Sequence, residues 1–429
     1  HMILDRINGP KDLKTLNAAE RKELAQEIRQ AMLKRASIHG GHFGPDFGIV
    51  EATIALHTVF DSPKDKIVWD VSHQVYPHKI LTGRKQAYLE EEHYDDVSGY
   101  SNPAESEHDF FEVGHTSTSI SLASGLAMAR DLRGGHENII AVIGDGSMSG
   151  GEALEGLDTV GEMGTNMIIV LNDNQMSIAE VHGGMYKGFE ELRRTGGKSE
   201  HNLFRAMGLD YRFVADGNDS EALIKVFREV KDMDHPVVVH IVTQKGKGYK
   251  FAEENKESWH WHMPFDIETG EVKQPYVDEA AELTASYLLD RLKTDKKLAI
   301  LTAATPASFG FTPERRKQAG KQFIDVGIAE EQAVAMASGL AKGGARPVFG
   351  DYATFFQRTY DQISQDVCIN NNPAVFLVFG ASMYSMNDVT HLCIFDIPMM
   401  ANIPNLVYLA PVSLAEYKAM LAWALDQTD

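Results

Sequence analysis

The stretch from 138 to 178 constrains the fold most, because apolar runs alternate there with polar, glycine-rich loops. A β-branched run over 139–143 predicts a buried parallel strand that leads into the loop 144–150, Gly-Asp-Gly-Ser-Met-Ser-Gly. A helical stretch begins near Glu152, and a second apolar strand over 167–171 runs into Asn-Asp-Asn-Gln-Met. Two such strands end at the same edge of a sheet, which predicts an α/β domain whose loops meet at that edge.

Oxygen ligands gather in these two loops. Asp145 supplies a carboxylate, Asn174 a side-chain amide oxygen, and the turn that follows offers backbone carbonyls such as that of Met176. An oxygen set with few charges suits Mg²⁺, which keeps positions for water and for substrate phosphates. Gly144 and Gly146 leave room for a diphosphate to approach the N–H groups of the turn. The two loops therefore predict a metal–diphosphate site.

Two other interpretations of the loop 144–150 stay open at this point. Its glycines resemble a dinucleotide-binding turn, but their spacing is GxGxxxG rather than GxGxxG. Asp145 would also face the pyrophosphate of a dinucleotide with no cation to offset its charge. The glycines could equally form a purely structural turn. The downstream Asn174 favours the metal–diphosphate interpretation.

Composition narrows the class of protein. The 429 residues are enough for two to three domains, and 41 Lys and Arg against 61 Asp and Glu give a formal charge of −20. This charge argues against general nucleic-acid binding, so a phosphate site has to be local. The two cysteines, Cys368 and Cys393, have no metal-ligand spacing and fit a reduced cytoplasm. No apolar run approaches membrane-spanning length, and no signal peptide is recognisable, so we expect a cytoplasmic protein.

Several histidines lie in turns that follow predicted strands or helices. His42 lies in a glycine-rich turn, His73 follows a strand over 66–70, and His115 precedes a helix that runs through Arg133. A lone histidine is more often a solvated or core residue, and small hydroxyl residues such as those after His115 are ordinary helix caps. Loops at strand ends nevertheless line the sites of open α/β sheets, which favours a functional role.

The region after a strand over 237–242 offers two further candidates. The sequence Lys245-Gly-Lys-Gly-Tyr249 could close over a phosphate or form a solvated turn. His260 and His262 could bind a metal, but no further ligands cluster nearby in the sequence.

The pattern of elements divides the chain into two α/β domains. We place a diphosphate- and magnesium-binding domain at 1–252, a linker that crosses the site at 253–278, and a second, incomplete domain at 279–429, which is short of strands. A helix over 16–34 begins at the cap Asn17, and 183–199 is predicted to be a mobile surface segment.

Taken together, these motifs resemble the thiamine-diphosphate enzymes of the transketolase superfamily, and within it the 1-deoxy-D-xylulose-5-phosphate synthases. The resemblance extends over the whole chain and rests on motifs in family order: Trp69–Arg84, Gly114–Ser119, Gly144–Gly146, Asn172–Ile178, Lys245–Tyr249, Asp325–Glu330 and Thr354–Gln362. It implies two thiamine-diphosphate-binding domains, each a mostly parallel sheet flanked by helices.

The resemblance also implies roles for individual residues. Asp145, Asn174 and the Met176 carbonyl would bind Mg²⁺. The residues implied to contact thiamine diphosphate are His73, Gly114, His115, Thr116, Gly146, Ser147, Asn174, Tyr249, Glu330 and Phe355. Those implied to line the substrate pocket or move protons are His42, His260, Tyr352, Arg358, Asn387 and His391.

The implied reaction decarboxylates pyruvate and transfers the two-carbon unit to glyceraldehyde 3-phosphate, giving 1-deoxy-D-xylulose 5-phosphate, a precursor of isoprenoids, thiamine and pyridoxal. Glu330 resembles the acid that hydrogen-bonds the aminopyrimidine and so favours loss of the thiazolium C2 proton. Its alternative is an ordinary first-turn glutamate stabilised by the helix dipole. His42, His260 and His391 would move protons during addition and release. A homodimer is the expected assembly.

The sequence departs from the family in the segment after the strand over 374–378. Gly380 replaces an arginine expected near the acceptor phosphate, and Asn387 stands where an acid is expected. Losing an arginine removes a bidentate phosphate contact. Two alternatives follow: the same donor chemistry with another aldehyde acceptor, or a catalytically silent paralogue that binds the cofactor.

Overall fold

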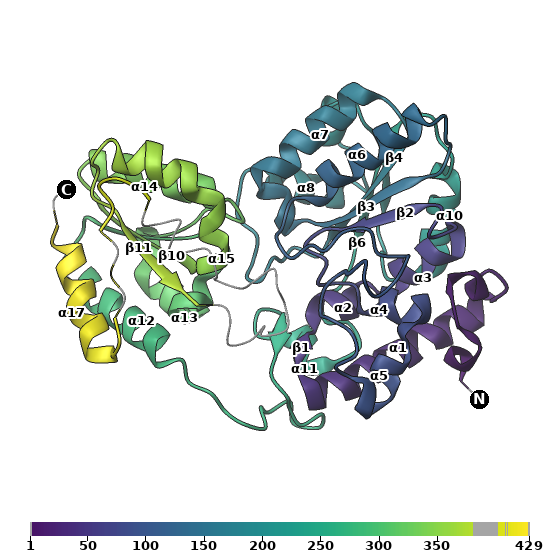
Figure 1. Ribbon diagram of the computed structural model, residues 1–429, viewed down its shortest axis with the longest axis horizontal. Coiled ribbons are helices and arrows are strands. Elements are labelled where there is room, and N and C mark those ends of the chain that lie inside the picture. Colours follow the sequence, from purple (N-terminus) through teal and green to yellow (C-terminus); the bar gives the residue numbers. More distant parts are fainter. Residues whose placement is uncertain (1, 381–401, 408, 410, 428–429) are drawn as a thin grey trace. The chain divides into compact units, whose positions relative to one another are not determined.

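The computed structural model describes residues 2–380, 402–407, 409 and 411–427, and it divides into two compact units, His1–Pro275 and Tyr276–Asp429 (Figure 1). Each unit is described by itself. Within the described residues, no helix has the length and apolarity needed to cross a membrane.

The first unit is built on a five-stranded, fully parallel sheet with the strand order β2-β3-β4-β6-β5. Its strands are nearly continuous runs of Val, Ile and Leu, which form central strands when both faces of a sheet are covered. The predicted strands are confirmed with small changes at their ends, whereas β5 was not predicted. The strands are β2 (Lys66–Trp69), β3 (Ile139–Gly144), β4 (Met167–Asp173), β5 (Asp210–Val214) and β6 (Pro236–Val242).

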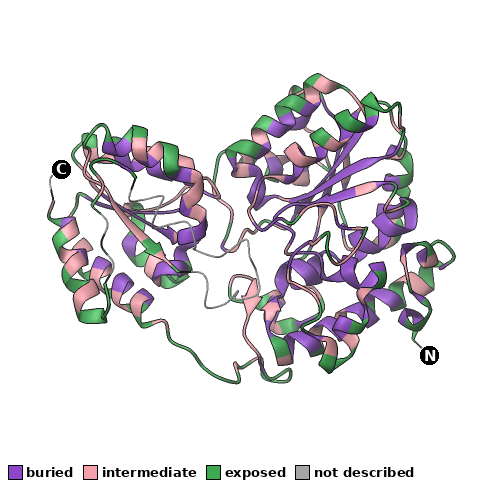
Figure 2. Cartoon of the chain, viewed as in Figure 1, coloured by how far each residue is buried: buried purple, intermediate pink, exposed green. Residues whose placement is uncertain are grey.

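Helices cover both faces of this sheet, and the sheet is buried between them (Figure 2). On one face, α3 (Val50–Val59) and α10 (Ser220–Val230) pack against the inward side chains of the strands. The other face is covered by α6 (Ser119–Leu132), α7 (Gly151–Met163) and α8 (Met185–Arg194).

The prediction of a mobile surface segment over 183–199 is wrong where α8 forms. Tyr186, Phe189 and Leu192 are buried in the core of the sheet's second face. Their spacing of three residues places them on one side of a helix. The flanking glycines and the charged residues between these three positions obscured this stripe in the sequence.

A second core in this unit joins the N-terminal helix to the segment before the unit's end. The helix α1 (Ala18–His39) begins at Asn17, whose side chain and that of Glu20 form the expected capping box. β1 (Gly41–His42) pairs antiparallel with β7 (Trp261–His262). Trp259 and Phe265, from the interval predicted as a linker, are buried in this core. The short helices of the unit are α2 (Gly44–Gly48), α4 (Tyr76–Lys79), α5 (Gln86–Leu89), α9 (Leu203–Ala206) and α11 (Lys250–Glu254).

The second unit has a four-stranded parallel sheet with the order β11-β10-β8-β9. Apolar side chains fill both faces of the sheet. Two parallel sheets flanked by helices confirm the predicted fold class. The elements are α12 (Glu279–Leu292), β8 (Leu298–Thr302), α13 (Pro313–Ala319), β9 (Phe323–Asp325), α14 (Glu330–Lys342), β10 (Arg346–Tyr352), α15 (Ala353–Phe356), β11 (Val375–Phe379) and α17 (Leu414–Leu425).

Candidate active site

The loops that follow β3 and β4 meet at the carboxyl edge of the first sheet. Asp145 is buried, and its carboxylate accepts hydrogen bonds from the N–H of Gly146 (3.0 Å) and of Gln175 (2.8 Å). The second of these bonds joins the two loop tips. Asn174 turns its Oδ1 back to accept the N–H of Met176 at 3.0 Å. The structure therefore brings the predicted ligand loops together, as adjacent parallel strands require.

Two buried acids, Asp145 and Asp173, lie at this edge of the sheet. Burial, followed by the negative charge of Asp173, raises the pKa of Asp145 well above its usual value. Asp173 itself is paired with His240 (2.8 Å) and Arg193 (2.7 Å), and these partners hold its pKa below the usual range despite its burial. A divalent cation at Asp145 would offset the charge that makes its carboxylate costly to bury.

A second loop, which carries the predicted Gly114, His115 and Thr116, is held beside the glycine-rich loop. Ser117 donates its hydroxyl to the carbonyl of Ser147 at 2.7 Å. A Cβ at Gly150 would lie 2.0 Å from Ser117 Oγ, so this close approach requires glycine. Beside Gly144, in contrast, a Cβ would meet no atom within 4 Å.

Asp70, which directly follows β2, holds this second loop in place through hydrogen bonds. Its two carboxylate oxygens accept the N–H groups of Ser117 and Ser119, each at 2.9 Å. Sequence reasoning did not identify Asp70, although its position directly after a buried strand was a usable signal. The turn after it is strained, since Val71 and Ser72 have φ of 57° and 62°. Strained backbone of this kind concentrates at functional sites.

Three predicted histidines form one cluster in the first unit. The ring centroids of His42 and His73 are 5.1 Å apart, those of His73 and His260 5.1 Å, and those of His42 and His260 6.1 Å. The pairing of β1 with β7 brings His42 and His260 together, because the N–H of Phe43 donates to the carbonyl of His260 at 3.0 Å. Residues more than 200 positions apart in the sequence thus share one site.

Lys245 supports this cluster and is not part of a solvated turn. Its side chain is buried, and its Nζ lies 2.8 Å from Nδ1 of His260. Burial lowers the pKa of Lys245 to about 7. Burial, together with Lys245, His73 and His42, lowers the pKa of His260 well below its usual value. His260 is therefore neutral at pH 7, with its Nδ1 accepting from Lys245.

Two other residues considered in the sequence pack in the aromatic core next to this cluster. Tyr249 is buried in the aromatic core with Phe43, Trp259 and Phe265, and its hydroxyl donates to the carbonyl of Ile267 at 2.7 Å. His262 stacks on Trp259 at a centroid distance of 3.7 Å. Both placements support packing roles. For His262, the stacking on Trp259 favours packing over the metal binding that the sequence had left open.

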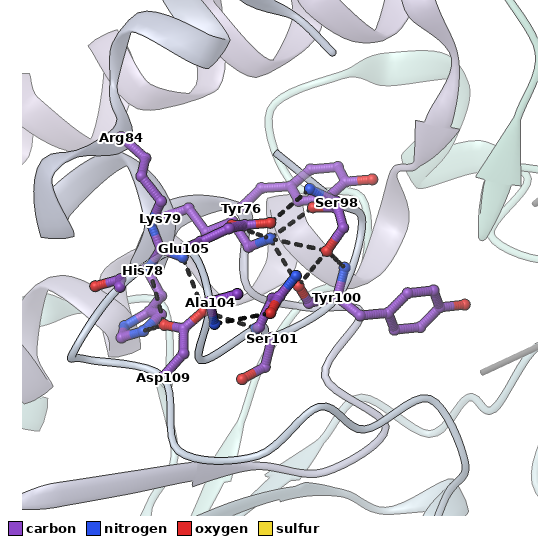
Figure 3. A network of polar contacts seen from close by, with 12 residues as sticks. Tyr76, His78, Lys79, Arg84, Ser98, Tyr100, Ser101, Ala104, Glu105 and Asp109 are labelled. Carbon is purple, nitrogen blue, oxygen red and sulfur yellow. Dashed lines mark hydrogen bonds and ion pairs between the residues drawn. The ribbon is translucent and has the colours of Figure 1, made fainter. Parts of the chain in front are cut away.

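A buried network of charged residues holds the backbone at Tyr100, a neighbour of the histidine cluster (Figure 3). Lys79, at the end of α4, donates to the carbonyls of Ser98 and Tyr100, each at 2.6 Å, and pairs with Glu105 at 2.9 Å. These bonds hold the chain at Tyr100, whose ring lies 5.3 Å from that of His42. Sequence reasoning missed Tyr100, because no local pattern connects residue 100 with residue 42.

The same network continues through a second acid. Asp109 accepts Arg84 (2.8 and 2.9 Å) and the ring of His78 (2.9 Å) as well as the N–H of Asn102 (2.9 Å). These partners hold the pKa of Asp109 far below its usual range, although burial alone would raise it. The histidine and basic residues of 76–84 therefore anchor the loop that carries Tyr100.

In the second unit, Glu330 is the first residue of α14 and is 3% exposed. Its Oε2 accepts no hydrogen bond from the described residues. Burial raises the pKa of Glu330 to about 7, while the charge of Arg358 opposes this shift. A solvated first-turn glutamate would be exposed, so the burial favours a site residue over the helix-dipole alternative.

The other predicted residues of this unit lie close to the same sheet edge. Tyr352 ends β10, and its ring lies 6.1 Å from that of Phe355 in α15. Arg358 acts electrostatically on Glu330. Asn387 and His391 lie outside the described residues.

Comparison with known proteins agrees with this arrangement. The family model described as 1-deoxy-D-xylulose-5-phosphate synthase matches residues 4–199 and 195–243, and the transketolase pyrimidine-binding domain matches 281–429. The two units thus define a protein of the transketolase class. The chain belongs to the 1-deoxy-D-xylulose-5-phosphate synthase family.

The relatives support this assignment over nearly the whole chain. The 1-deoxy-D-xylulose-5-phosphate synthase of Clostridium kluyveri (strain NBRC 12016) is 38% identical over 99% of this chain and 74% of its own length. That of Desulfitobacterium hafniense (strain DSM 10664 / DCB-2) is 41% identical over 99% and 73%. Among solved structures, a transketolase from Campylobacter jejuni subsp. jejuni NCTC 11168 shares 16% identity over 96% of this chain and 78% of that chain, with a TM-score of 0.45.

Proposed function

We propose that this chain joins pyruvate to glyceraldehyde 3-phosphate with loss of CO₂, giving 1-deoxy-D-xylulose 5-phosphate, with thiamine diphosphate as cofactor. The proposal follows the relatives, which bear the name of this synthase and cover 99% of the chain. The observation that carries it is Glu330, a buried acid whose Oε2 has no hydrogen-bond partner among the described residues, in the domain whose family binds a pyrimidine.

The residues of the first unit fit the diphosphate end of this cofactor. Asp145, Asn174 and the carbonyl of Met176 form an oxygen set suited to Mg²⁺. The space beside Gly144 and the N–H groups of the glycine-rich loop suit a diphosphate. Gly114, His115, Thr116, Gly146 and Ser147 lie in the two loops that Ser117 joins. When bound, thiamine diphosphate supplies a thiazolium ring that accepts the electron pair left by decarboxylation.

Glu330 holds and moves a proton in this proposal. With a pKa of about 7, its carboxyl is present in both protonation states at neutral pH. Its Oε2, to which no described residue donates, can donate a proton to a pyrimidine nitrogen, and the same atom can take the proton back. An acid and base whose pKa lies near the working pH performs both transfers well.

The histidine cluster serves the substrate. His260 is neutral and buried, and His42 lies beside it, so these two rings can exchange protons with substrate oxygens, while His73 between them contacts the cofactor in this proposal. In the second unit, Arg358 offers a guanidinium, which binds carboxylate or phosphate in a bidentate manner, and Tyr352 and Phe355 line the same sheet edge. His391 and Asn387 remain candidates on sequence grounds.

Because Gly380 stands where the family has an arginine, the identity of the acceptor aldehyde is a question for experiment. The relatives give no support to another aldehyde acceptor or to a silent paralogue. The buried site acids of both units also argue against a silent protein, because buried ionisable groups are costly to keep without a function. Mg²⁺ binding, a homodimer and a cytoplasmic location complete the proposal, as the sequence analysis expects.

Release of CO₂ tests the function directly. The purified chain, supplied with thiamine diphosphate, Mg²⁺ and pyruvate, should release CO₂ when glyceraldehyde 3-phosphate is added, and the product should have the mass of 1-deoxy-D-xylulose 5-phosphate. Unphosphorylated glyceraldehyde is the matched control for the acceptor. Equal rates with both aldehydes would reject the phosphorylated acceptor, and cofactor binding without CO₂ would reject the synthase.

A further inference from the structure

The short strand β1, which carries His42, pairs with β7 along one of its edges. Successive N–H groups of a strand point to opposite edges. The N–H of the next residue, Phe43, faces β7 and donates to the carbonyl of His260 at 3.0 Å, so the N–H of His42 faces away from β7. It donates to the hydroxyl oxygen of Tyr76 at 3.3 Å. Tyr76 therefore takes the place that a neighbouring strand would have on this edge.

The hydroxyl group of Tyr76 comes so close to β1 that the strand needs a glycine. Gly41 has a φ of 125°, a backbone conformation that residues with a Cβ rarely adopt. A Cβ at Gly41 would lie 2.9 Å from the hydroxyl oxygen of Tyr76, so a side chain there would displace the hydroxyl group or the strand. This hydroxyl group therefore lies against both residues of β1.

Tyr76 is itself held by its backbone and by its ring. Its N–H donates to Oδ1 of the fully buried Asp46 at 2.9 Å. The centre of its ring lies 5.4 Å from the guanidinium carbon of Arg35 and 5.5 Å from the ring of Tyr88. Arg35 is 4% exposed and donates to two backbone carbonyls, at 3.1 and 2.7 Å. A side chain with these contacts has little freedom, so its hydroxyl group stays in one place.

The position of the His42 ring depends on this backbone, because every side-chain torsion starts there. The ring of His42 lies 5.1 Å from that of His73, 5.3 Å from that of Tyr100 and 6.1 Å from that of His260. A shift of β1 would move the His42 ring against all three neighbours. Misplacement of a reacting group by about 1 Å can cost about 10²-fold in rate.

We propose that Tyr76 is a positioning residue for His42: its hydroxyl group accepts the His42 N–H and thereby fixes the His42 ring where it exchanges protons with substrate oxygens. The consequence for the reaction rests on the proposed function, whereas the contact between Tyr76 and His42 does not. Tyr76 acts through His42 and needs no contact of its own with the substrate.

Amide hydrogen exchange in the cofactor-free full chain tests the contact. Carbonyl-¹³C glycine and ¹⁵N histidine together select the Gly-His peptide groups, of which the chain has three, at His42, His115 and His136. Tyr76→Phe keeps the ring and loses the hydroxyl group, so exchange at His42 should become about tenfold faster. The other two signals should keep their rates, which shows that the variant is folded. Unchanged exchange at His42 would overturn the proposal.

CO₂ release from pyruvate, with the cofactor, Mg²⁺ and glyceraldehyde 3-phosphate present, tests the consequence. Tyr76→Phe should lower kcat by about tenfold to 10²-fold. The KM for pyruvate should change by less than about twofold, because a misplaced His42 ring weakens the transition state rather than binding. His42→Asn keeps the N–H but lacks the ring, so adding Tyr76→Phe to it should slow the reaction no further. An unchanged kcat, a change in KM alone, or an equal further loss in the double variant would overturn the proposal.

Tyr88→Phe is the matched control. Tyr88 is 1% exposed, its ring packs on the same Arg35 at 4.6 Å, and its hydroxyl group makes no hydrogen bond with the described residues. Loss of this buried hydroxyl group should leave both the exchange at His42 and kcat unchanged. Effects as large as those of Tyr76→Phe would reflect the aromatic core in general and would overturn the proposal. If wild type released no CO₂, the proposed function would be rejected, and the exchange rate at His42 would still decide whether Tyr76 holds His42.

Discussion

Three buried acids of the first unit and two of the second differ in how their oxygens are hydrogen-bonded. In the first unit, both carboxylate oxygens of Asp70 and of Asp109 accept hydrogen bonds, and Asp173 is paired with a histidine and an arginine. In the second unit, Glu330 and Asp351 are equally buried, yet each keeps an oxygen with no donor among the described residues.

This difference separates acids that build a site from acids that act in it. A satisfied buried carboxylate fixes loops, and where its partners are basic, as for Asp109 and Asp173, their effect outweighs its desolvation and lowers its pKa. An unsatisfied one costs stability and keeps a proton near neutral pH. Substitution of Asp109 or Asp173 should therefore reduce stability, and substitution of Glu330 should reduce chemistry.

The largest expected effect is on the chemistry of Glu330. Glu330→Gln keeps the size of the side chain but cannot give up a proton. We expect exchange of the cofactor's C2 proton, followed by NMR, to slow by about 10²–10⁴-fold. The second unit should keep its stability, because the glutamine removes a costly buried ionisable group. Unchanged exchange would remove Glu330 from its proposed role and end the contrast between the units.

The next effect is on stability in the first unit. Asp109→Asn removes the carboxylate that pairs with both Arg84 and His78 and leaves Arg84 only its contact with Glu105, and breaking such a buried pair costs about 3 kcal/mol in the free energy of unfolding. Urea unfolding of wild type and variant measures this difference.

Asp234→Asn provides the matched control for Asp109. The side chain of Asp234 is 98% exposed, so the same exchange should change stability by less than about 0.5 kcal/mol. A similar loss of stability in both variants would mean that the buried network around Asp109 stabilises the protein no more than an exposed acid does.

Glu330 and Asp109 should contribute to the pH dependence of stability with opposite signs. The folded pKa of Glu330, about 7, lies above its unfolded value, so the second unit should lose stability as pH rises from 4.5 to 7, by up to about 3 kcal/mol. The depressed pKa of Asp109 acts in the other sense, and its contribution is lost as pH falls below about 4.

Urea-dependent proteolysis, with peptides from each unit identified by mass spectrometry, reads the two stabilities separately at pH 3, 4.5 and 7.5. Glu330→Gln should abolish much of the pH dependence of the second unit. If the second unit gained stability as pH rose from 4.5 to 7.5, or if Asp109→Asn left the loss of stability of the first unit below pH 4 unchanged, the contrast between these acids would be wrong.

The sequence predicted the parts of the site that depend on local pattern. The β-branched runs gave the central strands, and the positions directly after them gave Asp145 and Asn174, because parallel strands end at a common edge. The capping pair Asn17 and Glu20 was also recognisable from its spacing.

Long-range contacts were not accessible in this way. The contact of Tyr100 with His42 depends on a buried network that no periodicity records. The pairing of β1 with β7 involves two residues on each strand, too few for a pattern. Asp351 looked like any polar residue at a strand end, and its burial beside Glu330 follows from the packing of α14 on β10.

The smallest expected effect tests how completely the first unit satisfies its acids. Tyr211 donates its hydroxyl to Nδ1 of His240 at 2.7 Å, and the other ring nitrogen of His240 contacts Asp173 at 2.8 Å. Tyr211→Phe removes one bond from this buried chain and should cost about 1 kcal/mol in urea unfolding. The pairing of Asp173 with Arg193 should persist, so the acid stays ionised and the neighbouring Asp145 keeps its raised pKa. A loss of stability several times larger would show that the hydrogen bonds among Tyr211, His240 and Asp173 strengthen one another. The hydrogen bonding of the first unit's buried acids would then depend on the whole network rather than on each acid separately.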